Sequence, residues 1–219
     1  MPLEIPSRPW ERVGVDLFTF DNKDFLITVD YLSNYWEIDK LKNTLVSTVI
    51  LKLKSHFARY GCPDQVVSDN GPQFDCQEFR KLAETWNFEH TPSSPGNSKA
   101  NGKAESPVKT AKSLLRKAFD SGKDPYMTIL DYRNTPTQGM DSSPVQRLMN
   151  WRTKTLLPTS KTFLQPRMTY PEKDQRNLAK RQEQQVRYFN RGAKDLRDLA
   201  EGDGRKRLSP WERGCCDEY

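Results

Sequence analysis

The stretch that most constrains this chain runs from Val66 to Glu105. It opens with two valines that read as a short buried strand, and Asn70-Gly71-Pro72 stops this strand just after Asp69. Asp69 is therefore expected at the exposed carboxyl end of a strand, where open α/β sheets place their working residues. Glu105 opens a pattern of helical spacing over 106–118, and 35 residues separate the two acids.

A third acid, Asp16, lies upstream inside residues 10–20, which read as a first strand. Three carboxylates on a frame of strands and helix suit two divalent cations, and hard oxygen ligands favour Mg²⁺ or Mn²⁺. Two such ions about 4 Å apart can activate an attacking oxygen and stabilise the leaving oxygen of a phosphodiester. A rigid strand suits Asp16, because one aspartate must approach both ions, whereas Glu105 need only complete the site.

The segments around these acids resemble a known family. They read Val-Asp-Leu-Phe at 15–18, Ser-Asp-Asn-Gly-Pro-Gln-Phe at 68–74 and Asn-Gly-Lys-Ala-Glu at 101–105. Together they are similar to the D, D-35-E catalytic core of retroviral and retrotransposon integrases, with gypsy-like long-terminal-repeat elements as the nearest subgroup. Tyr-Arg-Asn-Thr-Pro at 132–136 and Ser-Pro at 143–144 also match, so the likeness covers roughly residues 7–165.

The resemblance implies a ribonuclease-H-like fold, DNA as the substrate, and Asp16, Asp69 and Glu105 as catalytic and metal-binding residues. Residues 91–102 are rich in Pro, Ser, Gly and Asn and predict a loop, which could act as a lid next to Glu105. Family members usually carry an aromatic residue and a glutamine in this loop. Here those places read Gly-Asn-Ser-Lys at 96–99, so the acids are kept but the usual loop residues are not.

A row of cations follows Glu105 along the predicted helix. The positions at i+4, i+7 and i+11 share a face with Glu105, and they are Lys109, Lys112 and Arg116. Cations beside a metal-binding acid could hold phosphates on either side of a scissile bond, and the family has lysines at matching offsets. Lys103 and Asn101 are further candidates for DNA contact. The alternative is a solvated helix face with an ordinary Glu105–Lys109 pair.

The remaining patterns predict an α/β fold. Their order is three strands (10–20, 25–29, 35–38), a helix (44–60), a strand at 66–67, a helix (about 76–86), a strand (87–90) and then further helices. This order fits a mixed five-stranded sheet flanked by helices, with a C-terminal helical extension. Thr44 is the expected cap of the first helix.

Several single residues call for a structural interpretation. Asp30 is interpreted as a strand-end acid outside the metal site, and His56 as a surface or boundary residue of the first helix. Tyr126 and Met127 are expected in the core. The cysteines make no zinc-type pair, and Cys62 and Cys76 are expected to be partly buried reduced thiols.

The predicted division of the chain has five parts: an extended lead-in (1–9), an integrase-type catalytic core (10–151), a linker (152–171), a charged solvated helix (172–200) and a truncated or aberrant tail (201–219). The histidine–cysteine zinc module usual upstream in the family is not expected in this chain. Lysine and arginine exceed the acids by six, which is compatible with a polyanionic partner. No apolar run approaches 18 residues and no N-terminal leader pattern is visible, so an intracellular protein acting in the nucleus is expected.

The function that follows is DNA integration by two-metal polynucleotidyl transfer, with 3′-end processing and strand transfer, carried out by a homodimer or higher multimer as the resemblance implies. Three alternatives stay open. The chain could be a catalytically silent DNA-binding remnant of a retrotransposon polyprotein. It could be a ribonuclease-H-type nuclease that only hydrolyses. It could also be a structural multimerisation unit.

Overall fold

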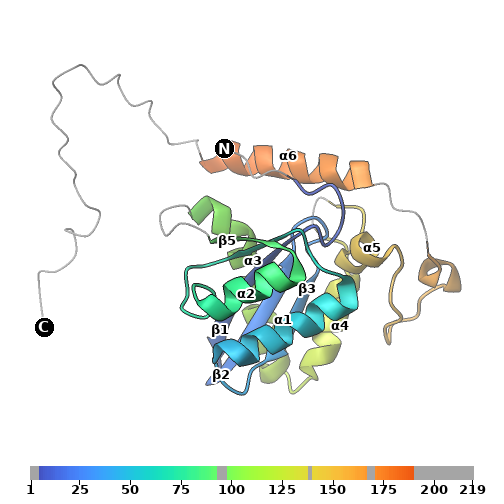
Figure 1. The fold of residues 1–219 in the computed structure, drawn as a ribbon. Coiled ribbons are helices and arrows are strands. Elements are labelled where there is room, and N and C mark those ends of the chain that lie inside the picture. The colour runs from blue at the N-terminus through green and yellow to red at the C-terminus, as the bar shows by residue number, and fades with distance from the viewer. Residues whose placement is uncertain (1–4, 93–97, 138–139, 167–170, 190–219) are drawn as a thin grey trace, which may run out of the picture. The chain divides into compact units, whose positions relative to one another are not determined.

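The computed structural model describes residues 5–92, 98–137, 140–166 and 171–189, with the side chains of 98–106, Pro171 and Phe189 outside that description. It confirms the predicted class, since a mixed five-stranded sheet is flanked by helices (Figure 1). The strand order is β3-β2-β1-β4-β5. The strands are β1 (Arg12–Phe20), β2 (Lys23–Asp30), β3 (Trp36–Lys40), β4 (Gln65–Ser68) and β5 (Glu89–Pro92).

The first three strands form an antiparallel meander, and β4 and β5 continue the sheet in parallel with β1. A two-residue turn joins β1 to β2, and both of its residues, Asp21 and Asn22, have positive φ (49° and 53°). Two positive φ values are typical of a type I′ hairpin, which asparagine and aspartate tolerate. The helices are α1 (Val46–Tyr60), α2 (Gln77–Trp86), α3 (Ser98–Asp120), α4 (Pro125–Asn134), α5 (Pro144–Met149) and α6 (Pro171–Phe189), with a 3₁₀ turn η1 (Lys161–Leu164).

Each face of the sheet has its own apolar core. On one face Val13 and Val15 of β1 pack with residues of α1 and α2 such as Leu53 and Phe79. On the other face Phe18 of β1 packs with the α3 and α4 cluster, whose buried members include Val108, Ala111, Leu115 and Ile129. The alternation of side chains along β1 therefore separates an α1/α2 face from an α3/α4 face.

Helix α3 begins earlier than its sequence pattern predicts. It starts at Ser98, so Glu105 lies inside the helix instead of opening it, and residues 98–102 of the predicted loop are helical. The strand before it, β5, reaches Pro92. Lysine and alanine are good helix formers and are frequent over 99–104, and this local propensity overrides the loop-like composition. Residues 93–97 of the predicted loop lie outside the described residues.

The predicted cap of α1 was wrong by one residue. The helix begins at Val46, and Asn43 Oδ1 accepts hydrogen bonds from the backbone N–H of Leu45 at 3.3 Å and from Thr48 Oγ1 at 2.7 Å. Asn43 therefore orders the helix start. The Thr44 side chain instead lines a cleft at the protein surface.

Helix α4 buries less than expected. Tyr126 and Met127 are 77% and 42% exposed, whereas Ile129 is 6% exposed. A surface helix buries only one stripe, and the first turn of α4 lies outside it. The expectation of partly buried thiols also fails for Cys62, which is exposed, while Cys76 is half-buried.

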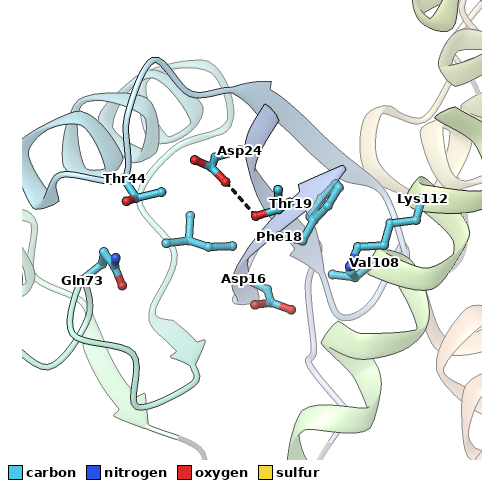
Figure 2. Close-up of a pocket in the computed structure, with 9 residues that line it drawn as sticks. Asp16, Phe18, Thr19, Asp24, Thr44, Gln73, Val108 and Lys112 are labelled. Carbon is cyan, nitrogen blue, oxygen red and sulfur yellow. Dashed lines mark hydrogen bonds between the residues drawn. The ribbon is translucent and has the colours of Figure 1, made fainter. Parts of the chain in front are cut away.

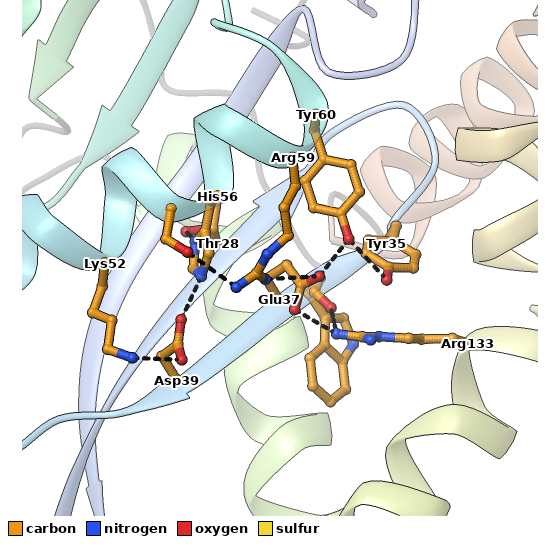
Figure 3. Close-up of polar contacts among 11 residues, drawn as sticks. Thr28, Tyr35, Glu37, Asp39, Lys52, His56, Arg59, Tyr60 and Arg133 are labelled. Carbon is orange, nitrogen blue, oxygen red and sulfur yellow. Dashed lines mark hydrogen bonds and ion pairs between the residues drawn. The ribbon is translucent and has the colours of Figure 1, made fainter.

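His56 is the clearest correction on the α1/α2 face, because it is fully buried and not at the surface. Its Nδ1 lies 2.9 Å from Thr28 Oγ1 and its Nε2 lies 2.7 Å from Asp39 Oδ2 (Figure 3). Lys52 Nζ donates to Asp39 Oδ1 at 3.0 Å. Position 56 follows the buried Leu53 by three residues, so it faces the sheet, and a ring with both nitrogens bonded can be buried there.

A second polar cluster, centred on Glu37, lies beside the His56 cluster (Figure 3). Glu37 of β3 accepts hydrogen bonds from Tyr60 of α1 and from Arg133 Nη2 of α4, the latter at 2.8 Å (Figure 3). The Arg133 guanidinium also lies over the Tyr35 ring, 4.6 Å from its centroid. One strand is thereby tied to helices on both faces of the sheet.

Asp30 has the structural role expected of it. It is fully buried and accepts the backbone N–H groups of Trp10 at 2.9 Å and Ser33 at 2.8 Å. Burial raises the pKa of its carboxyl, although these hydrogen bonds oppose the rise.

The first turns of α6 are docked, whereas the sequence predicted a solvated helix. Leu178 is 4% exposed in a small cluster with Leu32 and Met140, and Gln175 Nε2 donates to the Pro6 carbonyl at 3.0 Å. The predicted residues 190–200 of this helix and the tail 201–219 lie outside the described residues, and the domain limits stay a prediction. Within the described part of the chain, no helix has the length and apolar character needed to cross a membrane.

Candidate active site

Asp16 and Asp69 come from neighbouring strands. β1 and β4 pair in parallel with Gly14 opposite Val67, so each acid lies two residues beyond that pair. Neighbouring strands run about 5 Å apart, and residues at equal positions along a parallel pair project to the same face. Strand pairing therefore brings the backbones of two of the three predicted acids side by side.

The alternation along β1 puts Asp16 on the α3/α4 face. Its side chain is half-exposed and lines a cleft of about 390 Å³ (Figure 2). Val108 and Lys112 of α3 line the same cleft, as does Phe18 of β1. An acid at this position is open to solvent yet fixed by a strand that pairs on both sides.

Asp69 follows the last residue of β4 and is held by the turn that it starts. Its Oδ1 accepts the backbone N–H of Gly71 at 3.1 Å, an Asx turn that fixes one carboxylate oxygen. A Cβ at Gly71 would lie 3.0 Å from that same oxygen. The turn therefore leaves no space for a side chain at Gly71 without moving the carboxylate.

Glu105 belongs to α3, but its side chain lies outside the described residues, as do the side chains of Asn101 and Lys103. Among the side chains that are described, no group of three acids, histidines or cysteines surrounds a common point. The pair Asp16 and Asp69 is therefore the part of the predicted triad with a described geometry, and the role of Glu105 stays a prediction.

Lys112 is the cation that α3 brings to the cleft. It is half-exposed, and its Nζ lies 5.3 Å from the centroid of the Phe18 ring, which is stacked on Phe25 at 5.3 Å. A cation over an aromatic face is stabilised by the ring quadrupole. In the described part of the structure Lys112 forms no ion pair, so its charge is available to an anion that enters the cleft.

Lys109 and Arg116 share the helix face of Lys112 but are exposed and do not line the cleft. The reason is the angle around the helix. Around the helix axis, Lys112 is the cation nearest the buried stripe formed by Val108, Ala111 and Leu115. Lys112 therefore lies partly against the protein, whereas Lys109 and Arg116 lie farther from the stripe and project into solvent. DNA contact by Lys109 and Arg116 stays a prediction.

The rest of the cleft was not foreseen from the sequence. Thr19, Asp24, Thr44 and Gln73 also line it, and Thr19 Oγ1 donates to Asp24 Oδ1 at 2.7 Å (Figure 2). Gln73 could have been found, because it lies in the motif that carries Asp69. Asp24 could not, because only the hairpin register that pairs it with Thr19 brings it there.

The donor chemistry of this site fits a divalent cation. Asp16 and Asp69 offer carboxylate oxygens from positions two residues beyond the Gly14–Val67 pair of the neighbouring strands, and both side chains are partly exposed. Carboxylate oxygens are the ligands that Mg²⁺ and Mn²⁺ prefer. The two aspartates are therefore the described residues that could hold a metal.

The curated proteins that are similar to this chain include two of much greater length. The chain is 28% identical over 178 residues to an uncharacterized protein of Caenorhabditis elegans, covering 77% of this chain and 14% of that protein. It is 28% identical over 118 residues to the Gag-Pol polyprotein of Walleye dermal sarcoma virus, covering 52% of this chain and 7% of the polyprotein. The chain thus spans only a small part of these relatives. No family model matches it.

Solved structures share its fold. The simian T-cell lymphotropic virus intasome contains a chain with a TM-score of 0.61 and 22% identity, covering 77% of this chain and 63% of that one. The catalytic core domain of BIV integrase has a TM-score of 0.54 at 18% identity, covering 64% and 93%. The HTLV-2 integrase catalytic core domain, solved in complex with magnesium, has a TM-score of 0.53 at 18% identity, covering 64% and 97%.

These comparisons agree with the motifs around Asp16, Asp69 and Glu105, and they confirm the resemblance drawn from them. The sheet order and flanking helices are those of a ribonuclease-H-like core. The chain is therefore similar in sequence to part of a retroviral Gag-Pol polyprotein and has the fold of an integrase catalytic core.

Proposed function

We propose that this chain is a metal-dependent polynucleotidyl transferase core that acts on DNA. It would trim a 3′ end and then join that end to a second duplex, which is the chemistry of DNA integration. The observation that carries the proposal is the parallel pairing of β1 with β4, which puts Asp16 and Asp69 each two residues beyond the Gly14–Val67 pair, with Asp16 in a cleft that also contains Lys112.

Asp16, Asp69 and Glu105 would hold two Mg²⁺ or Mn²⁺ ions. When bound, such ions lower the pKa of an attacking water or hydroxyl and offset the charge on the leaving oxygen. The carboxylates of the two aspartates support this role by their chemistry and partial exposure, and the magnesium complex of the HTLV-2 core is consistent with it. Asp69 would enter the reaction already oriented, because Gly71 holds one of its oxygens.

Lys112 would bind the phosphate next to the scissile bond. Its ammonium is held over Phe18 in the cleft of Asp16, so the phosphate would be placed close to the acids. Positioning and charge stabilisation provide most of the rate in phosphoryl transfer. The exposed Lys109 and Arg116 would extend the contact along the DNA backbone outside the cleft, and Lys103 and Asn101 would add to it from the start of α3.

The active form would be a homodimer or higher multimer working on nuclear DNA. Support comes from the solved relatives, one of which is part of an intasome and another of which is a trimeric form.

The test is a DNA-joining assay with Mn²⁺ and a short duplex, comparing wild type with Asp69→Asn. Asp69→Asn should lower joining by at least about 100-fold, because the amide loses the ligand charge while the fold is kept. Asp75→Asn is the matched control: it makes the same change in an exposed acid of the same loop, outside the cleft. Joining by Asp69→Asn at the wild-type rate would refute the proposal.

The same assay separates the alternatives. Cleavage of an RNA–DNA hybrid without joining of DNA ends would favour a hydrolytic nuclease of the same fold. DNA binding with neither cleavage nor joining would favour a catalytically silent remnant. Circular dichroism of each variant would establish that loss of activity is not loss of fold.

A further inference from the structure

His90 of β5 contacts Ser68 of β4 on the α1/α2 face of the sheet, behind the candidate site. His90 Nε2 lies 2.8 Å from Ser68 Oγ, and the same hydroxyl oxygen lies 2.8 Å from the main-chain carbonyl oxygen of Asp69. Ser68 is fully buried and His90 is half-buried. The buried hydroxyl of Ser68 thus connects His90, on the α1/α2 face, with Asp69, whose carboxylate is expected on the α3/α4 face.

The number of hydrogens decides the direction of these bonds. A serine hydroxyl carries one hydrogen, and a carbonyl oxygen can only accept, so the Ser68 hydrogen is donated to Asp69. The second contact is then a hydrogen bond only if His90 Nε2 carries a hydrogen and donates it to Ser68. Burial lowers the pKa of His90, which favours the neutral ring at neutral pH. The bond to Ser68 then requires the single N–H hydrogen of this neutral ring to lie on Nε2.

The ring of His90 is fixed from other directions as well. Phe79 of α2 packs against it edge-on, with centroids 4.7 Å apart and planes at 63°. The backbone of His90 is paired with Val66 in the β4–β5 register. The donor nitrogen therefore has a defined position relative to the end of β4.

Asp69 is consequently held at two points. Ser68 binds its main-chain carbonyl, and the N–H of Gly71 binds its Oδ1 at 3.1 Å. The carbonyl of Asp69 lies just where β4 has ended, so no further strand pairing of β4 restrains the acid.

We propose that His90 and Ser68 are positioning residues, which fix the backbone of Asp69 so that its carboxylate meets a divalent cation in one geometry. The inference rests on the proposed function, because it assigns a role relative to the metal that Asp69 would hold. Partners that orient a metal ligand typically change metal affinity by roughly 10–100-fold when they are removed.

The test is calorimetric titration of the full chain with Mn²⁺ alone. Ser68→Ala removes the hydroxyl. His90→Phe keeps an aromatic ring against Phe79 but removes the donor, and His90→Gln returns an N–H donor at nearly the same reach. Glu89→Gln is the control, because it changes an exposed neighbour on β5.

Ser68→Ala and His90→Phe should each weaken Mn²⁺ binding by roughly 10-fold, with His90→Gln and Glu89→Gln close to wild type. Circular dichroism checks that each variant is folded. If His90→Phe does not fold, the Mn²⁺ affinity of Ser68→Ala alone tests the positioning role. ¹⁵N NMR of the wild-type ring should show the hydrogen on Nε2, a result that packing alone does not require.

Failure of the positioning role and failure of the proposed function would give different results. If wild type binds Mn²⁺ and Asp69→Asn does not, but Ser68→Ala binds as wild type does, the positioning role is overturned and the proposed function stands. A neutral His90 with its hydrogen on Nδ1 overturns the positioning role in the same way. If wild type shows no Asp69-dependent binding of Mn²⁺, the proposed function falls and this inference falls with it.

Discussion

At the scale of single residues, Gly71 limits how far the Asp69 carboxylate can move in the turn after β4. Its N–H holds Asp69 Oδ1, and a Cβ placed on it would approach that oxygen to 3.0 Å. Real Cβ atoms rarely come so close to a carboxylate oxygen, so an added methyl group would displace the carboxylate or the turn. The backbone N–H itself would remain.

Gly71→Ala should therefore weaken Mn²⁺ binding and lower DNA joining by about 10-fold, while the free energy of unfolding changes by no more than about 1 kcal/mol. The measurements are a Mn²⁺ titration and a urea denaturation curve. Gly122→Ala is a control in which a Cβ would meet no atom within 4 Å, although its φ of +62° carries a backbone cost. Wild-type metal affinity in Gly71→Ala would show that the carboxylate does not depend on the turn.

At the scale of elements, the contact between α1 and β3 depends on a carboxylate. Hydrogen bonding from His56, followed by that from Lys52, lowers the pKa of Asp39 to about 2, although burial opposes it. The pKa of an aspartate in an unfolded chain is about 3.9. The lowered pKa means that this carboxylate stabilises the fold at pH values above about 4 and loses its contribution as pH falls through about 2.

Asp39→Asn should accordingly remove part of the acid sensitivity of the protein. Between pH 5 and pH 2 the free energy of unfolding of wild type should fall by about 1–2 kcal/mol more than that of the variant, a value reduced from the full shift because the Asp39 side chain is 22% exposed. Urea denaturation at a series of pH values measures this. Parallel pH profiles for the two proteins would contradict the assignment.

At the scale of the whole molecule, the first turns of α6 belong to the packed body that carries the site. Leu178 is buried with Leu32 and Met140, and the Lys173 ammonium lies 2.8 Å from the Asp141 carboxylate. The apolar contact is the stronger of these, because the ion pair is exposed to solvent. Leu178 is thus the buried apolar contact between these turns and the rest of the described chain.

Leu178→Ala should lower the free energy of unfolding by about 2 kcal/mol, at the low end for a buried leucine because its cluster is small. Val186→Ala, on the same helix but at a side chain that is 49% exposed, should change it by less than about 0.5 kcal/mol. Equal effects of the two substitutions, measured by urea denaturation, would show that Leu178 does not dock the helix.

The sequence by itself determined the fold class, the order of the elements, the position of Asp16 within its strand and that of Asp69 just after its strand. These depend on local patterns, since an apolar pair followed by Asn-Gly-Pro ends a strand whatever surrounds it. The start of α3 was missed, because the Pro-, Ser- and Gly-rich composition before Glu105 predicted a loop where helix propensity prevailed.

Only the tertiary structure decided which distant groups meet. The pairing of β1 with β2 brings Asp24 to the cleft, and that of β4 with β5 brings His90 to Ser68. The packing of α1 on the sheet turns His56 from an expected surface residue into a buried link between Thr28 and Asp39. Strand register and helix packing are fixed by contacts between residues far apart in the chain, and a one-residue change of register would reverse the face of every side chain in a strand.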